Sequence, residues 1–162
     1  MFIKKIGALA SVFILTGAAH SAPLQWPLDA PVVVQEFGVT EFVRSNPGFY
    51  REGEHLAIDI IDSIRGFDAP VYAAADGVVL AKGTGTCPNF TEPECNNGYG
   101  NWILLSHKKL GLATLYEHLA YPPDVNAGTQ VKARTVIGFQ GSSGKAIGSH
   151  LHFAVYSGTI TV

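Results

Sequence analysis

The stretch Asn101-Trp-Ile-Leu-Leu-Ser-His-Lys-Lys-Leu-Gly-Leu-Ala-Thr-Leu-Tyr-Glu-His-Leu119 decides the fold class. Its two ends, Asn101–His107 and Leu112–Leu119, are rich in aliphatic and aromatic side chains, whereas Lys108 to Gly111 has the composition of a turn. Apolar runs of this length on either side of a short turn predict two β-strands.

Shorter apolar runs lie on both sides of that pair. Asp76-Gly77 separates Pro70–Ala75 from Val78–Leu80, which predicts a tight hairpin. Beyond the first residues, no segment keeps a helical period over ten residues. Short strands divided by Gly and Pro predict an all-β fold, an antiparallel sandwich or barrel, in one domain. The other predicted strands are Pro31–Phe37, Leu56–Ile61, Thr135–Phe139 and Leu151–Tyr156.

Composition narrows the class of protein. The chain has 162 residues, of which 47% are hydrophobic and only 15% charged, and this balance argues against disorder and coiled coil. The formal net charge is -2 and no basic patch is visible, so we expect no nucleic-acid partner.

The N-terminus has the features of an export signal. Lys4 and Lys5 precede the uncharged apolar run Ile6–Ala19, and small residues follow it. The pattern predicts a secretory signal peptide over residues 1–21 and a mature domain over residues 22–162. An uncleaved membrane anchor is the alternative, but the run is shorter than a typical membrane span, so we expect no membrane insertion after cleavage.

The sequence has two cysteines, Cys87 and Cys95, which both lie in the loop Gly83–Asn97. The predicted export determines the oxidation state that we expect for them. In an oxidising compartment such a pair is most simply a disulfide, with two free thiols as the alternative. A metal site is not indicated, because no further pair of Cys or His accompanies them.

Two histidine strings 95 residues apart carry the chemistry: His55-Leu-Ala-Ile-Asp59 and His150-Leu-His152. In a strand, side chains at i, i+2 and i+4 share a face, so each string would project its polar groups together. Two imidazoles and a carboxylate from neighbouring strands would make a three-ligand zinc site with a fourth position for water. Such a set is typical of catalytic rather than structural zinc.

The motifs, taken in order, resemble those of the lysostaphin-type or LytM-like zinc metalloendopeptidases. The resemblance covers roughly residues 36 to 156 and implies an antiparallel β-sandwich, a barrel-sandwich hybrid, with a groove over one sheet and one zinc ion. The matching pieces are Phe37-Gly38, Arg44-x-x-Pro47, His55-x-x-x-Asp59-Ile60, Pro70–Val78, Gly98-Tyr-Gly-Asn101, Thr114–Leu119, Gly141-x-Ser-Gly144 and Gly148–Phe153.

The resemblance also implies roles for five residues. It assigns the zinc ligands to His55, Asp59 and His152, and two further active-site histidines to His118 and His150. The string H-E-x-x-H, which supplies a glutamate base in many zinc peptidases, is absent. We therefore assign His118 and His150 jointly as general base and electrostatic stabiliser, without dividing the two roles between them.

Other polar residues give weaker signals. Arg44, Tyr50 and Asn101 are candidate substrate contacts, although solvated loop positions and, for Asn101, a turn are equally compatible. Glu54 and Glu117 adjoin site histidines and should point to the opposite strand face as surface carboxylates. His107 ends a predicted strand and is expected to be structural.

The sequence thus predicts a secreted zinc metalloendopeptidase that cuts stems or cross-links of peptidoglycan, where the substrate follows only from the resemblance and the export signal. We expect a monomer in the periplasm of a Gram-negative bacterium, or secreted otherwise. One alternative is a non-catalytic module that binds the cell wall or activates an amidase. Another is a structural zinc domain with a fourth protein ligand. The sequence leaves open which peptide bond is cut.

Overall fold

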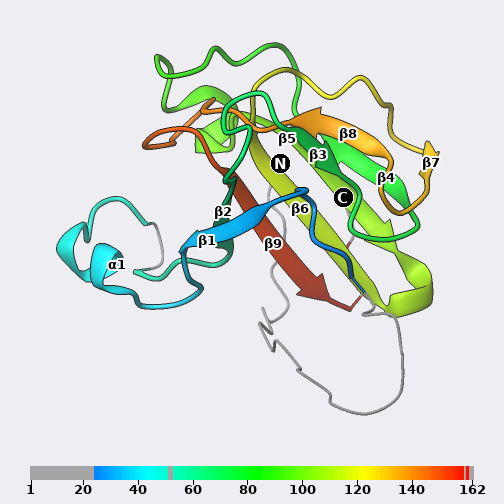
Figure 1. Cartoon of the computed structure of the whole chain (residues 1–162), viewed down its shortest axis with the longest axis horizontal. Coiled ribbons are helices and arrows are strands. Elements are labelled where there is room, and N and C mark those ends of the chain that lie inside the picture. The colour runs from blue at the N-terminus through cyan, green and yellow to red at the C-terminus, as the bar shows by residue number, and fades with distance from the viewer. Residues whose placement is uncertain (1–23, 51–52, 159, 161–162) are drawn as a thin grey trace.

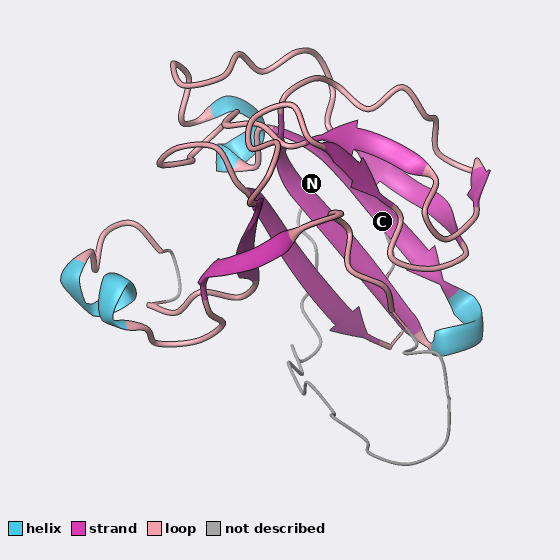
Figure 2. Ribbon diagram, in the orientation of Figure 1, coloured by secondary structure: helices cyan, strands magenta, loops and turns pink. Residues whose placement is uncertain are grey.

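A computed structural model describes residues 24–50, 53–158 and 160 of the chain, so the predicted signal peptide lies outside the described residues. The fold is all-β and mostly antiparallel, as predicted, and the large sheet does not close into a barrel within the described part (Figures 1 and 2). In that same part, no helix has the length and apolar character needed to cross a membrane.

Within the described residues, nine strands form two sheets, and helical segments are short. The α-helix α1 covers Glu41–Ser45, and two 3₁₀ turns cover Cys95–Gly98 and Lys108–Leu110. The strands are β1 Pro31–Gln35, β2 Ile58–Asp62, β3 Pro70–Tyr72, β4 Gly77–Lys82, β5 Asn101–His107, β6 Leu112–Leu119, β7 Gln130–Val131, β8 Val136–Phe139 and β9 Leu151–Ser157.

The larger sheet has the order β1-β2-β9-β6-β5-β4-β7, and β3 pairs with β8 in the smaller one. Strands β5 and β6 have the predicted bounds and form the centre of the large sheet. Strand β9 lies between β2 and β6 and pairs with both. This order brings the first and last histidine strings together although almost 100 residues separate them.

The two faces of the large sheet bury different side chains. One face packs against the small sheet, where Val71 of β3 and Ile137 of β8 join Ile103, Tyr116 and Leu151 in one core cluster. The other face carries a second cluster around Trp102, Leu104, Leu115 and Ala154. Because side chains alternate along a strand, residues next to those of the first cluster in β2, β6 and β9 face away from the small sheet.

The predicted hairpin at Asp76-Gly77 is wrong. Strand β3 pairs with β8 while β4 pairs with β5 and β7, so the chain crosses from one sheet to the other at this point. The Asp76 carboxylate accepts from the backbone N–H of Ala133 (2.9 Å) and from Lys132 Nζ (3.0 Å). The Asp76 carbonyl accepts from Nδ1 of the buried His107, which therefore has the predicted structural role.

The segment between β1 and β2 projects to one side of the sheets and contains α1 (Figure 1). The Thr40 side chain caps this helix by accepting from the backbone N–H of Val43 at 3.3 Å, and Val43 is buried. Aromatic rings of Phe42, Phe49 and Tyr50 pack edge to face within the segment and form a partly exposed aromatic cluster.

Candidate active site

One row of side chains crosses three neighbouring strands. Asp59 on β2 lies opposite His152 on β9, and His152 lies opposite Glu117 on β6. Directly opposed residues in antiparallel strands project to the same face, so these three side chains lie in line. They lie on the face turned away from the small sheet, because Ile60, Leu151 and Tyr116 next to them point into the first core cluster.

His55 joins the row from just before β2. It forms an isolated bridge with Gly38, with backbone hydrogen bonds of 2.7 and 3.0 Å, and its side chain is fully buried. Its Nδ1–H donates to the carbonyl of Glu36 at 2.9 Å. Since a carbonyl only accepts, the proton is on Nδ1 and the lone pair of Nε2 faces the row.

Three atoms converge at one point of this row. His55 Nε2 lies 3.1 Å from Asp59 Oδ1 and 3.1 Å from His152 Nδ1, and His152 Nδ1 lies 2.8 Å from Asp59 Oδ1. Zinc bonds of about 2.0–2.1 Å at tetrahedral angles place ligand atoms about 3.3 Å apart. The donor types and their spacing therefore fit zinc, and His55, Asp59 and His152 are the residues that would hold it.

Asp59 stays ionised in this setting. Burial opposes its charged form, but the close contacts of Asp59 with the imidazoles of His152 and His55 outweigh burial and hold the pKa of Asp59 well below its ordinary value. A carboxylate that is already deprotonated can bind a metal ion without first losing a proton.

His118 is placed by a break in the β5–β6 ladder. Ile103 pairs with Tyr116 but Asn101 pairs with Leu119, so β6 has one extra residue there, and His118 has φ of 61°. This bulge interrupts the alternation of side chains, and as a result Glu117 and His118 both line the same groove. The Nδ1–H of His118 donates to the carbonyl of Ser143 at 2.8 Å.

His150 is also held by a backbone carbonyl. It lies before β9, in a bridge with Gly141, and its Nδ1–H donates to the carbonyl of Gly148 at 3.0 Å. Its Nε2 lies 3.6 Å from Asp59 Oδ1, and its ring centre is 4.9 Å from that of His118. Burial lowers the pKa of both His118 and His150, so both imidazoles are neutral at pH 7 with Nε2 free of a proton.

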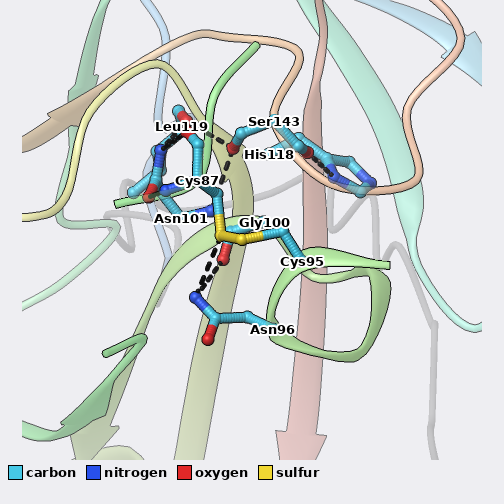
Figure 3. Close-up of a disulfide and its surroundings, with 8 residues drawn as sticks. All are labelled: Cys87, Cys95, Asn96, Gly100, Asn101, His118, Leu119 and Ser143. Atoms are coloured by element: carbon cyan, nitrogen blue, oxygen red, sulfur yellow. Dashed lines mark hydrogen bonds between the residues drawn. A yellow bond between two sulfur atoms is a disulfide. The ribbon is translucent and has the colours of Figure 1, made fainter. Parts of the chain in front are cut away.

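A hydrogen-bond network fixes the carbonyl that orients His118 (Figure 3). Ser143 Oγ accepts from the backbone N–H of Asn101 at 2.9 Å and donates to the carbonyl of Leu119 at 2.6 Å. The Asn101 side chain donates to the carbonyls of Leu119 and Cys87, and it accepts from the N–H of Cys87. The Cys87–Cys95 disulfide, predicted from the sequence, is formed beside this network.

Two backbone segments approach each other closely at the same place. A Cβ atom added at Gly100 would overlap Ser143, and one added at Gly144 would overlap the backbone of Gly98 and Gly100. Both glycines also have positive φ, of 65° and 72°, which other residues rarely adopt.

A sequence model described as peptidase family M23 matches residues 53–162, which include all five histidine and aspartate positions of the site. The chain belongs to peptidase family M23. This membership makes it a hydrolase of the peptidase class, and zinc dependence is a general property that the family implies.

Curated relatives agree with the M23 assignment. The DD-carboxypeptidase/endopeptidase Mpg of Neisseria meningitidis serogroup B is 39% identical over 84 residues, which are 52% of this chain and 16% of that protein. The protein of the same name from Neisseria gonorrhoeae gives the same values. The chain therefore spans only a small part of the length of these relatives.

Solved structures share the fold. The catalytic domain of lysostaphin from Staphylococcus simulans has a TM-score of 0.55 and 28% identity, over 68% of this chain and 73% of that one. A zinc-containing peptidase from Vibrio cholerae has a TM-score of 0.60 and 23% identity, over 84% of this chain and 37% of that one. This M23 chain thus has the all-β architecture of the lysostaphin catalytic domain.

The M23 site opens into a groove of about 1070 Å³. Phe42, Phe49 and Tyr50 line it from the segment around α1, and Tyr99, Lys145 and Ile147 line it from the loops that precede β5 and β9. Tyr50, one of the candidate substrate contacts, lines this groove, with its ring centre 5.4 Å from that of His55. Its hydroxyl oxygen accepts from Gln35 Nε2 at 2.6 Å, and burial raises the pKa of Tyr50.

The other two predicted substrate contacts do not lie in the groove. Arg44 is exposed on α1 and is absent from the groove lining. Asn101 is 1% exposed, and its side chain is used in the network around Leu119 and Cys87. Its function in the structure is therefore to hold the loops together, as the alternative of a turn residue implied.

The prediction of two surface carboxylates is wrong for Glu117. Glu117 is 5% exposed and lines the groove, because it alternates with Tyr116, which points into the first core cluster, and pairs directly with His152. Glu54 also lines the groove and is partly buried. The sequence-based prediction places His118 on the regular alternation, whereas the bulge brings His118 to the side on which Glu117 already lies. A bulge depends on how two strands pair, so the sequence of β6 alone gives no sign of it.

Proposed function

We propose that this protein is an exported, monomeric zinc metalloendopeptidase that hydrolyses peptide bonds in the stems or cross-links of peptidoglycan. The observation that carries the proposal is the meeting of three zinc-compatible ligand atoms with two neutral histidines at the floor of one groove. Bound zinc would polarise the scissile carbonyl and lower the pKa of a water molecule towards about 7.

The residues of the chain would supply the proton transfers. His118 and His150 both carry their proton on Nδ1, fixed by backbone carbonyls, so each has Nε2 available to accept a proton from the attacking water. The resulting imidazolium can stabilise the developing oxyanion or return the proton to the leaving amine. The Tyr50 hydroxyl, which stays protonated, can donate to a carbonyl of the substrate.

Peptidoglycan as substrate is supported by the names of the Neisseria relatives and by the predicted signal peptide. The Cys87–Cys95 disulfide fits an oxidising compartment outside the cytoplasm, and we propose the periplasm of a Gram-negative bacterium. The alternative of a non-catalytic, amidase-activating module is less favoured, because such a module needs neither the ligand triad nor two oriented bases.

The test measures zinc content and sacculus digestion with one preparation. We expect elemental mass spectrometry to find one zinc ion per chain. We also expect the protein to release soluble peptide fragments from purified sacculi. A chelator should stop the release and added zinc should restore it. Mass spectrometry of the fragments would identify the bond that is cut. Fragment release that a chelator leaves unchanged, or release only when an amidase is added, would refute the proposal.

A further inference from the structure

Glu117 is a buried carboxylate in the groove that the proposed reaction does not use. It lies on β6 at the end of the row that starts with Asp59, and its side chain is only 6% exposed. Burying a carboxylate costs free energy unless a cation or hydrogen-bond donors compensate for it. Its position therefore calls for a positively charged or proton-donating neighbour within the site.

His152 is one such neighbour. Its ring presents Nδ1 to Asp59 Oδ1 at 2.8 Å and Nε2 to Glu117 Oε2 at 3.9 Å, so one imidazole lies between two carboxylates. If Nδ1 binds a metal ion, the proton of the neutral ring must be on Nε2, on the side of Glu117. A closer approach of about 1 Å would bring this N–H and the carboxylate to hydrogen-bond distance.

Charge gives an independent reason. The ligand set of two imidazoles and Asp59 provides one negative charge for a divalent ion, and Glu117 brings a second one into the same buried region. Interactions between charges are strong where water is excluded. Lys145, which also lines the groove, donates from Nζ to the carbonyl of Phe49 at 2.7 Å, so its charge is directed to the wall around α1.

We infer that Glu117 is a positioning residue that orients His152 through Nε2 and raises the affinity of the site for zinc. The inference rests on the proposed zinc site and deepens it. Outer-shell carboxylates of this kind typically change metal affinity by about 10- to 100-fold. Glu117 contacts neither the ion nor the substrate in this role, so its effect passes through the ring of His152.

The experiment measures zinc affinity of the full chain by competition with a chromogenic chelator. Glu117→Gln should weaken zinc binding by about 10- to 100-fold while the apo protein keeps its circular-dichroism spectrum. Glu117→Asp retains the charge but shortens the side chain, so we expect an intermediate affinity. Glu94→Gln is the matched control, because it removes an exposed carboxylate that lines the same groove but lies outside the row of Asp59, His152 and Glu117. Its zinc affinity should stay within about twofold of the wild type.

Two results would overturn the inference. One is a Glu117→Gln variant that binds zinc as tightly as the wild type. The other is a stoichiometry of two zinc ions in the wild type and one in the variant, which would make Glu117 a ligand together with His118 and His152, as their closeness allows. A wild-type protein that binds no zinc would instead refute the proposed function, so the two failures are distinguishable.

Discussion

The two halves of the site are built in different ways. Asp59, His152 and Glu117 occupy one row of a regular antiparallel ladder, and strand pairing sets their spacing. His118 and His150 lie where that ladder is interrupted, and carbonyls of Ser143 and Gly148 orient their rings. Regular pairing thus places Asp59 and His152, two of the three candidate metal ligands, whereas loops select which nitrogen of His118 and His150 faces the groove.

The largest expected effect comes from the ladder half. Asp59→Ala removes the only carboxylate among the three converging ligand atoms, so zinc content should fall to background and fragment release from sacculi should stop. Apo and zinc-supplemented melting curves should coincide for this variant, because metal binding is coupled to folding only where the metal binds. Zinc-dependent stabilisation that survives in Asp59→Ala would show that the metal lies elsewhere.

The loop half should separate binding from turnover. His150→Ala leaves the three ligand atoms in place, so zinc content should stay at one ion per chain while the rate of fragment release falls by about 10²- to 10⁴-fold. His118→Ala should behave in the same way. The pH–rate profiles of His150→Ala and His118→Ala would then show which histidine acts as the base. Loss of the base should remove the acid limb of the profile. Normal activity in either variant would remove that histidine from the mechanism.

A smaller effect is expected one step away from His118. Ser143→Ala removes the hydroxyl that joins Asn101 N–H to the carbonyl of Leu119, at a fully buried position. We expect a loss of about 1–3 kcal/mol in the free energy of unfolding, measured by urea titration. Because the loop that orients His118 is loosened, kcat should fall more than zinc affinity. An equal fall in both would mean that the two halves are not independent.

The smallest effect concerns stability alone. Asp62 ends β2, and burial raises its pKa, but hydrogen bonds from the backbone N–H groups of Arg65, Ala30 and Ile64 outweigh burial and lower it. A carboxyl with a lowered folded-state pKa stabilises the fold above its unfolded value of 3.8 and loses this contribution as the pH falls further. Unfolding free energies between pH 7 and pH 3 should thus decrease less steeply in Asp62→Asn. Parallel curves would contradict this account.

The same division explains what the sequence could predict. The strands β5 and β6, and the meeting of His55, Asp59 and His152, follow from apolar runs and a period of two, which are local patterns. His55 reaches the row through a single bridge with Gly38 rather than within a strand. The predicted convergence of His55 with Asp59 is therefore present, although the predicted strand does not include His55.

What the sequence could not predict depends on long-range pairing. The orientation of His118 follows from one extra residue in β6 relative to β5, and the crossing at Asp76-Gly77 follows from the choice of partners by β3 and β4. Asn101 has the polarity of a groove residue, but it is buried, and its side chain forms hydrogen bonds with Cys87 and with the carbonyl of Leu119. The residues next to these positions in the sequence do not predict any of these three features.

The close approach of Gly100 and Gly144 has a consequence for engineering this groove. Neither residue has a functional group, yet any side chain at either would displace the backbone that carries the acceptor for His118. Saturation mutagenesis should therefore show two intolerant positions without chemical activity of their own. Loop exchanges that aim at new substrates should keep the close contact between Gly100 and Gly144. They should instead vary the segment around α1, which lines the same groove.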